Sequence, residues 1–466
     1  MFYPSKEEFL KLAKKHNLIP VYKELEIGGH SPVETFSKIE GEYSFLLESI
    51  EGSEKIARFS FLGTVAKKDV KKLKKLSEIR KLVKSYNPAI ISGLPRFHGG
   101  LVGHVNYDVV REVENIPDKN PDDLKIPPMI FLLAENLLAF DHVRRKLIVI
   151  ANTKVGQDPE SAYVLACQKI EQLEKQLEKP EKLKALKTKP ANLEFSSNFT
   201  KKQYEAVVEK GKEYIKAGDI IQFVPSQRLE TETKVNPFDV YRILRSINPS
   251  PYMYYLKLGE LKIVGASPEV MVRLEDGRAT VRPIAGTRPR GRDKKEDLAM
   301  EKELLASKKE VAEHVMLVDL GRNDLGRVCD FGSVRVTEKM IVERYSHVMH
   351  IVSNVTGQLK PEYDAVDLLS ATFPAGTVTG APKVRAMEII DELENVKRGP
   401  YAGCIGYFGF SGEMDTCITI RTILFKDGKA YIQAGAGIVA DSAPAEEYKE
   451  TLNKARAMLR AIEIAS

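Results

Sequence analysis

Runs of apolar residues indicate β-strands along the first part of the chain. These runs are short, rich in Val, Ile, Leu, Phe and Tyr, and bounded by turn-forming residues, which is the pattern of strands. They cover residues 43–47, 58–62, 101–107, 129–141 and 147–151. Between them, the Lys-rich residues 67–84 have a helix-like pattern. We expect a helix with a solvated face there.

In the second part of the chain, predicted strands follow one another instead of alternating with helices. Thr200 and Gln203 form a capping-box pattern that predicts a helix running to about residue 216. Strands are expected at residues 220–224, 252–258, 261–265, 270–274 and 279–283, and helices at 295–318, 363–371, 382–393 and 444–464. Strands in succession indicate an α+β fold with antiparallel sheets.

A polar connection separates the two parts. Ala162, Ala166 and Ile170 are helically spaced and predict an amphipathic helix at residues 158–178, after which lysines and prolines extend to Pro190. This composition is typical of a linker. We therefore predict an N-terminal region at residues 1–185 and a second region at residues 196–466. A surface hairpin within one domain is the alternative.

Composition narrows the class of protein. The chain has 466 residues, enough for two or three domains, and a formal net charge of only +6. This charge suits an anionic substrate, but the Lys-rich stretch lacks interleaved aromatic residues, so we expect no nucleic-acid binding. The four cysteines form no Cys-x-x-Cys pair, and neither a secretory signal nor a membrane-spanning stretch is evident. We expect a cytoplasmic protein without membrane contact.

Two glycine-rich segments resemble nucleotide-binding motifs without meeting their requirements. Residues 435–440 (GAGIVA) fit G-x-G-x-x-A, but the helix predicted after them leaves no room for a βαβ unit. Residues 376–383 (GTVTGAPK) lack the P-loop spacing. We expect the first segment to be a turn whose N–H groups approach an anion. The second is a helix start that holds a carboxylate or is an ordinary cap.

Two pairs of glutamates are candidates for metal binding. Glu310 and Glu313 lie three residues apart in one predicted helix, and Glu447 and Glu450 do so in another. This spacing puts both carboxylates of a pair on one helix face. Two such pairs would suit Mg²⁺, which prefers oxygen ligands and keeps several waters. A solvated face is the alternative for each pair, and the spacing does not show whether the pairs meet.

Eight segments together resemble a known enzyme family. They are FVPSQ (223–227), GASPE (265–269), PIAGTRPRG (283–291), EHVMLVDLGRND (313–324), YSHVMH (345–350), GTVTGAPKVR (376–385), DTCITIR (415–421) and QAGAG (433–437). In this order they resemble the chorismate-utilising enzymes, and the first half resembles the N-terminal region of anthranilate synthase large subunits. The resemblance implies two stacked antiparallel sheets flanked by helices.

The resemblance also implies a set of functional residues. It implies Mg²⁺ held by Glu313 and Glu450, with Glu310 and Glu447 close by. The ring carboxylate of chorismate would lie near the metal. The implied substrate-binding residues are Gly286, Thr287, Tyr401, Arg421, Gly435, Ala436, Gly437 and Lys454, with Thr377 and Arg421 on the enolpyruvyl side.

The implied reaction converts chorismate and ammonia to anthranilate and pyruvate, the first committed step of tryptophan biosynthesis. A hydroxyl is a poor leaving group, so a general acid is needed, and Glu269 matches the family's candidate. His350 matches the histidine assigned to loss of pyruvate, and Thr377 completes the implied catalytic set. Without the family match, Glu269 is a glutamate at a strand end, and His350 is a packed core residue.

Two positions favour anthranilate over other products of the family. Family members that add water to chorismate resemble one another in having a lysine that activates the water. At the corresponding position this chain has Gln222, an amide that cannot act as a base. Aminodeoxychorismate synthases typically have Pro-Ile-Lys-Gly-Thr where this chain has Ala285. An aminodeoxychorismate synthase component lacking that lysine remains the nearest alternative. A tryptophan-binding protein without activity is an alternative of another class.

Regulation and a partner are implied as well. The resemblance to anthranilate synthase large subunits implies a site for inhibitory tryptophan. The residues that would contact it are Ser49, Pro251, Tyr252 and Met253. A strand end and a proline turn are the alternative. No glutaminase nucleophile motif (G-x-C-x-G) is present. We therefore expect ammonia to come from a separate glutamine amidotransferase subunit, with a heterotetramer as the expected assembly.

Overall fold

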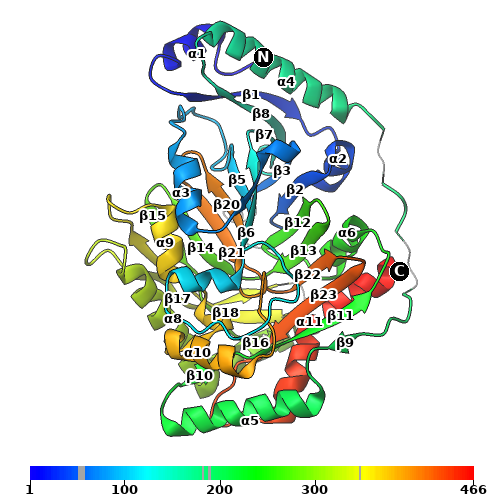
Figure 1. Ribbon diagram of the computed structural model, residues 1–466, viewed down its shortest axis with the longest axis vertical. Coiled ribbons are helices and arrows are strands. Elements are labelled where there is room, and N and C mark those ends of the chain that lie inside the picture. Colours follow the sequence, from blue (N-terminus) through cyan, green and yellow to red (C-terminus); the bar gives the residue numbers. More distant parts are fainter. Residues whose placement is uncertain (51–57, 181–182, 187–189, 346–347) are drawn as a thin grey trace.

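The computed structural model describes residues 1–50, 58–180, 183–186, 190–345 and 348–466. Ser346 and His347, which belong to one of the family-like segments, and part of the Lys-rich connection lie outside the described residues. The expected α+β fold of two large antiparallel sheets with flanking helices is confirmed (Figure 1). In the part of the chain that is described, no helix is both long and apolar enough to cross a membrane.

The first sheet combines strands from both parts of the sequence. In spatial order its strands are β1 (Leu18–Glu26), β8 (Lys146–Lys154), β7 (Asn136–Asp141), β3 (Phe59–Thr64), β2 (Tyr43–Glu48), β12 (Tyr252–Leu258), β13 (Leu261–Ser267), β22 (Thr422–Lys426), β23 (Lys429–Gly435), β11 (Ser226–Glu232) and β9 (Ser196–Ser197). Because β2 pairs with β12, residues 1–185 and 196–466 share this sheet. The boundary between them stays a prediction.

The second sheet is mixed in the same way, since β5 pairs with β20. In spatial order its strands are β16 (Ile284–Pro289), β18 (Val348–Gln358), β15 (Arg278–Val281), β14 (Val270–Glu275), β21 (Met414–Ile418), β20 (Cys404–Gly409), β5 (Gly100–Val105), β6 (Met129–Ala134) and β4 (Val70–Leu73), with β17 (Arg335–Arg344) beside β18. A small separate pair joins β10 (Gln222–Phe223) to β19 (Gly380–Ala381).

Three apolar layers hold these sheets and helices together. One layer lies between the two sheets, where Phe45 and Tyr254 of the first pack with Ile405 of the second. Another covers the outer face of the first sheet with α1 (Lys6–Leu12), α2 (Pro32–Ile39), α4 (Pro159–Leu177), α6 (Pro237–Ile247) and α11 (Pro444–Ala465). The third covers the second sheet with α3 (Leu76–Lys84), α8 (Lys308–Gly326) and α9 (Ala365–Thr372).

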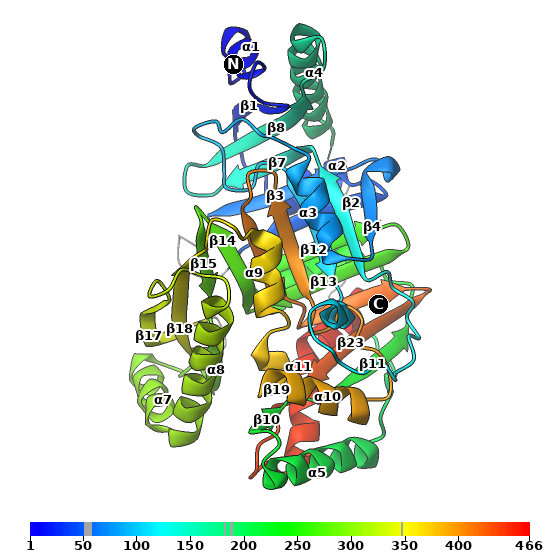
Figure 2. The same ribbon diagram turned by 60° about the vertical axis from the view of Figure 1, so that its left-hand side comes forward.

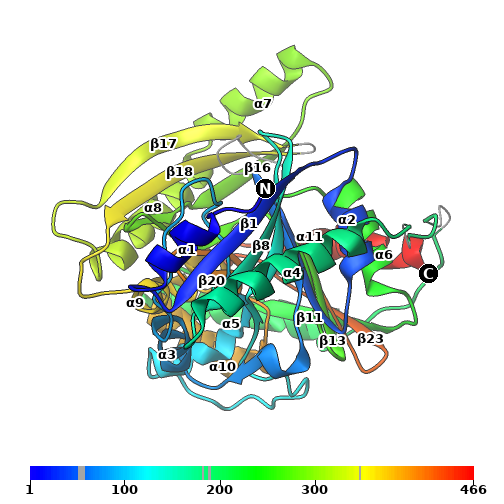
Figure 3. The same cartoon turned by 90° about the horizontal axis from the view of Figure 1, so that it is seen from above.

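The remaining helices lie at the ends of the molecule. Helix α5 (Lys201–Ala217) packs with α10 (Lys383–Leu393) and α11, and α7 (Lys294–Ala306) projects from the body beside α8 and the β17–β18 hairpin (Figures 2 and 3). Short 3-10 helices are η1 (Lys67–Asp69), η2 (Tyr107–Glu112) and η3 (Gly376–Val378).

Two predicted helices are corrected by the structure. Residues 67–84 contain η1, strand β4 and only then helix α3, because the short Val70–Leu73 run pairs with β6. Residues 295–318 belong to two helices, α7 and α8, which break at Ser307. The Ser307 hydroxyl accepts a hydrogen bond from the backbone N–H of Glu310, so it caps the second helix.

Candidate active site

Helices α8 and α11 bring the two glutamate pairs toward one lysine. Lys454 Nζ lies 2.7 Å from Oε1 of Glu450 and donates a hydrogen bond to the Gly435 carbonyl at 2.9 Å. Burial raises the pKa values of Glu313 and Glu447, and the neighbouring carboxylate of each pair adds to the effect. The positive charge of Lys454 acts in the opposite direction on both pKa values. One carboxylate of α8, Glu313, and both of α11 therefore lie within the electrostatic reach of a common ammonium group.

The donors of this cluster fit a hard cation. Within the described residues, no preassembled group of three or more His, Cys, Asp or Glu side chains could hold a metal by itself. Burial and the neighbouring carboxylate of each pair disfavour the ionised forms of Glu313 and Glu447, so a divalent cation between the helices would stabilise them. Glu313 and Glu450 would hold such an ion, with water and substrate as further ligands. Glu310 is already paired with Arg288, at 3.3 Å between Oε1 and Nη1.

Glu269 lies where the chain passes from strand β13 to strand β14. Its side chain is buried, and this burial raises the pKa of Glu269 to about 8, against the opposing effects of Thr377 and Lys454. Thr377 lies in η3, and its hydroxyl oxygen is buried without a hydrogen-bond partner among the described residues. At neutral pH the Glu269 carboxyl therefore carries a proton that it can donate.

His350 lies on strand β18 beside the turn of β16. Its Nδ1 atom is 2.9 Å from the Gly286 carbonyl and 3.1 Å from the Thr287 hydroxyl. Because a carbonyl only accepts, Nδ1 carries the proton and Nε2 keeps a lone pair. Burial, together with the nearby charge of Arg421, lowers the pKa of His350. The ring is half-buried, while Met349 and Ile351 are fully buried, so His350 is not part of the core layer.

Arg421 is a half-buried cation, and no carboxylate of the described residues pairs with it. It lies where the chain passes from strand β21 to strand β22, with a left-handed backbone (φ 51°). No carboxylate of the described residues lies within 4.0 Å of its guanidinium. Burial lowers the pKa of Arg421, and Tyr401 and Glu450 partly offset this. A half-buried, unpaired guanidinium of this kind favours an anionic ligand, which would supply the charge partner that it lacks.

Glycines let the backbone approach these side chains closely. A Cβ atom on Gly435 would lie 2.8 Å from the Tyr401 hydroxyl, and one on Gly437 would lie 2.5 Å from Nε2 of Gln222. Ala436, between them, is fully buried. Gln222 Nε2 in turn lies 3.4 Å from Oε1 of Glu313. The turn at residues 435–437 thus borders the same space as Tyr401, Lys454 and the α8 carboxylate.

A supporting ion pair escaped prediction from the sequence. Arg398 and Glu394 are paired and almost completely buried, and Arg398 also donates to the carbonyls of Val224 and Val378. The Arg398 guanidinium lies 5.5 Å from the ring centroid of Tyr401. The pair therefore fixes the segments that carry Tyr401 and Thr377. Nothing in the local sequence distinguishes Arg398 from a surface arginine.

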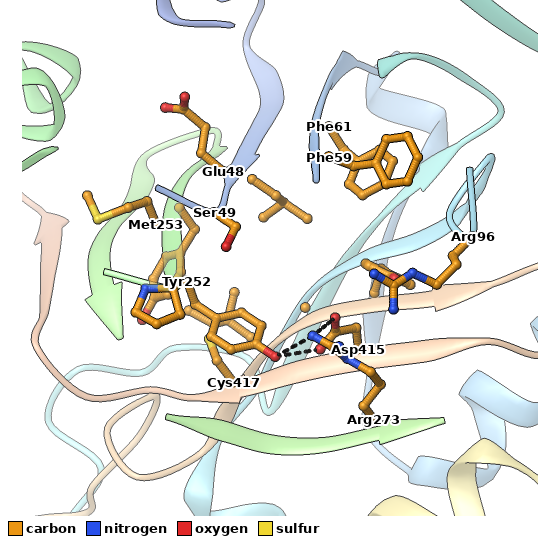
Figure 4. A pocket seen from close by; sticks show the side chains of 16 residues that line it. Glu48, Ser49, Phe59, Phe61, Arg96, Tyr252, Met253, Arg273, Asp415 and Cys417 are labelled. Carbon is orange, nitrogen blue, oxygen red and sulfur yellow. Dashed lines mark hydrogen bonds and ion pairs between the residues drawn. The ribbon is translucent and has the colours of Figure 1, made fainter. Parts of the chain in front are cut away.

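A pocket lies between the two sheets, and all four predicted tryptophan-binding residues line it. Its cavity volume is about 70 Å³, it is partly open to solvent, and we call it the inter-sheet pocket (Figure 4). Its walls include Glu48, Ser49, Phe59, Phe61, Pro251, Tyr252 and Met253 from the first sheet, and Arg273, Tyr407, Asp415 and Cys417 from the second. The Ser49 hydroxyl is buried without a hydrogen-bond partner among the described residues.

The family of the chain follows from comparison with known proteins. A model of the family described as chorismate binding enzyme matches residues 42–460, which is most of the chain. The chain belongs to the chorismate-binding enzyme family. The matched range includes the carboxylates, Glu269, His350, Arg421 and the inter-sheet pocket. The predicted resemblance to chorismate-utilising enzymes is thereby confirmed.

Full-length relatives narrow the comparison. The chain is 48% identical to anthranilate synthase component 1 of Acetivibrio thermocellus, over 99% of both chains. It is also 48% identical to that of Aquifex aeolicus, over 99% of this chain and 98% of the relative. The chain groups with component 1 proteins of anthranilate synthase and is a chorismate-utilising lyase, as expected.

Solved structures agree with the fold. The crystal structure of anthranilate synthase component I from Streptococcus pneumoniae superimposes with a TM-score of 0.80 at 39% identity, covering 94% of this chain and 99% of that one. The menaquinone-specific isochorismate synthase from Escherichia coli superimposes with a TM-score of 0.74 at 18% identity, covering 98% and 99%. The second likeness concerns the fold alone.

Proposed function

We propose that this enzyme converts chorismate and ammonia to anthranilate and pyruvate. The observation that carries the proposal is a buried, protonated Glu269 in the same site as the unpaired Arg421 and as His350 with a lone pair on Nε2. Chorismate is a dicarboxylate, and the reaction needs an acid for the leaving hydroxyl and a base for a ring proton. The site offers a cation, an acid and a base to match.

Binding positions chorismate between α8 and the Gly435–Gly437 turn. Arg421, beside Tyr401, takes the enolpyruvyl carboxylate in a charge-assisted pair. Lys454 and the backbone of Gly286 and Gly435 lie on the side of the ring carboxylate. Mg²⁺ held by Glu313 and Glu450 would supply positive charge to that carboxylate.

Glu269 and His350 act in two successive phases. In the first, ammonia adds at ring C2 and the C4 hydroxyl leaves with the proton that Glu269 donates. In the second, the C2 proton is removed at Nε2 of His350, and pyruvate is lost as the ring becomes aromatic. The Thr377 hydroxyl faces Glu269 and, with no other partner among the described residues, can hydrogen-bond the leaving oxygen.

Two side chains support ammonia as the nucleophile. Gln222 lies beside Glu313 and cannot take a proton from water, which disfavours water addition. Ala285 is buried on β16 and offers no amine to attack the ring. The ammonia comes, in our proposal, from a glutamine amidotransferase subunit, in accord with the name component 1 of the relatives, and the complex is a heterotetramer.

Tryptophan is the proposed inhibitor, and the inter-sheet pocket is its proposed site. Ser49, Pro251, Tyr252 and Met253 all line this pocket. Phe59 and Phe61 offer the apolar surface that an indole needs. We place the protein in the cytoplasm, where its free cysteines stay reduced.

Turnover by the isolated chain tests the proposal. With chorismate, ammonium and Mg²⁺, we expect anthranilate fluorescence that requires Mg²⁺ and falls when tryptophan is added. Glutamine as the only nitrogen source should give no product from the chain alone, and glutamine-dependent turnover would refute a separate amidotransferase subunit. Aminodeoxychorismate without anthranilate would refute the proposed product. Tryptophan binding without turnover would identify a regulatory protein instead.

A further inference from the structure

A buried polar cluster joins the two sheets at the inter-sheet pocket. The Tyr252 hydroxyl, from the first sheet, donates to Oδ1 of Asp415 in the second at 2.9 Å. Arg273 Nη2 lies 2.8 Å from Oδ2 of Asp415 and donates to the Tyr252 oxygen at 3.1 Å. We call Tyr252, Asp415 and Arg273 the inter-sheet link (Figure 4). A polar contact across an otherwise apolar layer depends on how the sheets are positioned.

The same two sheets are also joined by crossing segments that carry catalytic-site residues. The chain leaves the first sheet after Ser267 and enters the second at Val270, and Glu269 lies in that crossing. It returns from Ile418 of the second sheet to Thr422 of the first, and Arg421 lies there. A small displacement of one sheet against the other therefore moves Glu269 and Arg421 together.

Hydrogen bonds lock the two crossings to each other. The backbone N–H of Ile418 donates to the Glu269 carbonyl at 3.0 Å, and the Ser267 hydroxyl donates to the Ile418 carbonyl at 2.7 Å. The backbone N–H of Ala266 donates to the Arg421 carbonyl at 3.1 Å. The two crossings thus form one unit, which moves as a whole when one sheet is displaced against the other.

The link is attached to this unit through two paired strands. Arg273 lies opposite Asp415 on β14 and β21, and nearer the crossings Val270 lies opposite Cys417. The register of the pair shifts between Val270 and Val272. The irregularity therefore lies between the link and the crossings, which are only a few residues apart. A bulge of this kind lets a strand bend locally.

We propose that the inter-sheet link transmits occupancy of the pocket to Glu269 and Arg421. A ligand in the pocket contacts both sheets, and Arg273 Nε is buried without a hydrogen-bond partner among the described residues. An anionic group such as an amino-acid carboxylate can take this free donor and draw Arg273 away from Tyr252. Arg273 and Asp415 are then positioning residues. The inference rests on the proposed inhibition by tryptophan.

The test separates tryptophan binding from inhibition. The chain has no Trp residue, so the change in fluorescence of added tryptophan on binding is free of signal from protein Trp, in the absence of chorismate. The Tyr252→Phe variant keeps the ring in the pocket wall and removes only the linking hydroxyl. We expect it to bind tryptophan within about threefold of wild type. The ratio of activity without tryptophan to activity at saturating tryptophan should fall at least about fivefold in this variant. Fivefold is the lower end of ordinary allosteric coupling.

Tyr241→Phe is the matched control. It also removes a buried hydroxyl that donates to a carboxylate of the pocket wall, Glu48, but this bond stays on the first-sheet side. Its binding and inhibition should change in parallel. Asp415→Asn provides a second break in the link and should behave like Tyr252→Phe.

Two results would overturn the inference: parallel loss of binding and inhibition in Tyr252→Phe, or no change in either. If wild type bound no tryptophan, the proposed inhibitor would be wrong, and basal kinetics would then decide the role of the link. Tyr252→Phe should raise the KM for chorismate and lower kcat, while Tyr241→Phe should change neither. Equal basal kinetics in the two variants would refute the link in that case.

Discussion

Replacement of Glu269 by glutamine gives the sharpest test of the proposed chemistry. Glutamine keeps the size and polarity of the side chain but carries no proton to donate to a leaving hydroxyl. The wild-type carboxyl is protonated below a pKa of about 8 and loses its proton above it, because burial outweighs the opposing effects of Thr377 and Lys454. Activity that depends on this proton must therefore fall as the pH rises through about 8.

The size of the effect follows from the environment of Glu269. The difference between an ordinary pKa of 4.5 and about 8 corresponds to about 5 kcal/mol in favour of the protonated form. At pH 7 roughly nine tenths of the molecules then hold the acid, whereas an ordinary glutamate would hold it in well under ~1%. General acids of this kind contribute about 10²- to 10⁴-fold to the rate. We expect a loss of this order in Glu269→Gln.

The assay is kcat/KM for chorismate between pH 6 and pH 10, in the range of about two pH units either side of the Glu269 pKa. The concentration of free ammonia is held constant, since more ammonium is deprotonated at high pH. Wild type should lose activity about tenfold per pH unit above pH 8, and Glu269→Gln should lack this limb. Glu413→Gln is the matched control, because burial also raises the pKa of Glu413, to about 7, outside the candidate site.

The reasoning is refuted if the alkaline limb persists unchanged in Glu269→Gln. It is also refuted if Glu413→Gln removes the limb, since a carboxyl outside the candidate site would then control the profile. An unfolded variant is recognised by its circular dichroism, and a folded variant with wild-type kcat/KM at pH 7 shows that Glu269 donates no proton.

Three further predictions concern other parts of the molecule. Ala285→Lys introduces an amine beside the ring and should change the product distribution seen by chromatography; unchanged anthranilate formation would contradict the weight given to this side chain. Glu313→Gln should weaken the apparent affinity for Mg²⁺ at least about tenfold in an activity titration, whereas an unaltered titration curve would exclude Glu313 as a ligand. Arg398→Ala leaves Glu394 buried and unpaired and should lower the free energy of unfolding by about 3–5 kcal/mol in urea, while Lys6→Ala at an exposed pair should not change it measurably.

Local patterns predicted most elements because they depend on residues that are near in sequence. Helix α4 and strands β2, β3, β5 and β8 lie close to their predicted ranges, the run 129–141 is divided into β6 and β7, and β1 was not predicted. The pattern failed at residues 67–84, where lysines on an exposed strand resemble a helix face. It failed again at Ser307, because a cap inside an amphipathic stretch does not interrupt the helical spacing.

Long-range geometry was beyond the sequence. The glutamate pairs could be recognised from their spacing, but the approach of Glu313 on α8 to Lys454 on α11 depends on how these helices pack, and they are more than a hundred residues apart in the sequence. The family resemblance named Glu269 and His350, while the raised pKa of Glu269 follows from burial that only the fold creates. Arg398 had no signal at all, since its role comes from carbonyls that other segments bring to it.

The interleaved topology gives the predicted boundary near residue 190 a different meaning. Strands of the first region complete both sheets, so the first region cannot hold a regulatory pocket apart from the catalytic part. Ser49 and Tyr252 lie side by side in the wall of the inter-sheet pocket, and Tyr252 belongs to a strand that pairs with β13, which leads directly to Glu269. In our proposal, regulation and chemistry then share the same two sheets. A ligand that altered the spacing of the sheets at the inter-sheet pocket would, in this proposal, act where the chain crosses between them, which is where Glu269 and Arg421 lie.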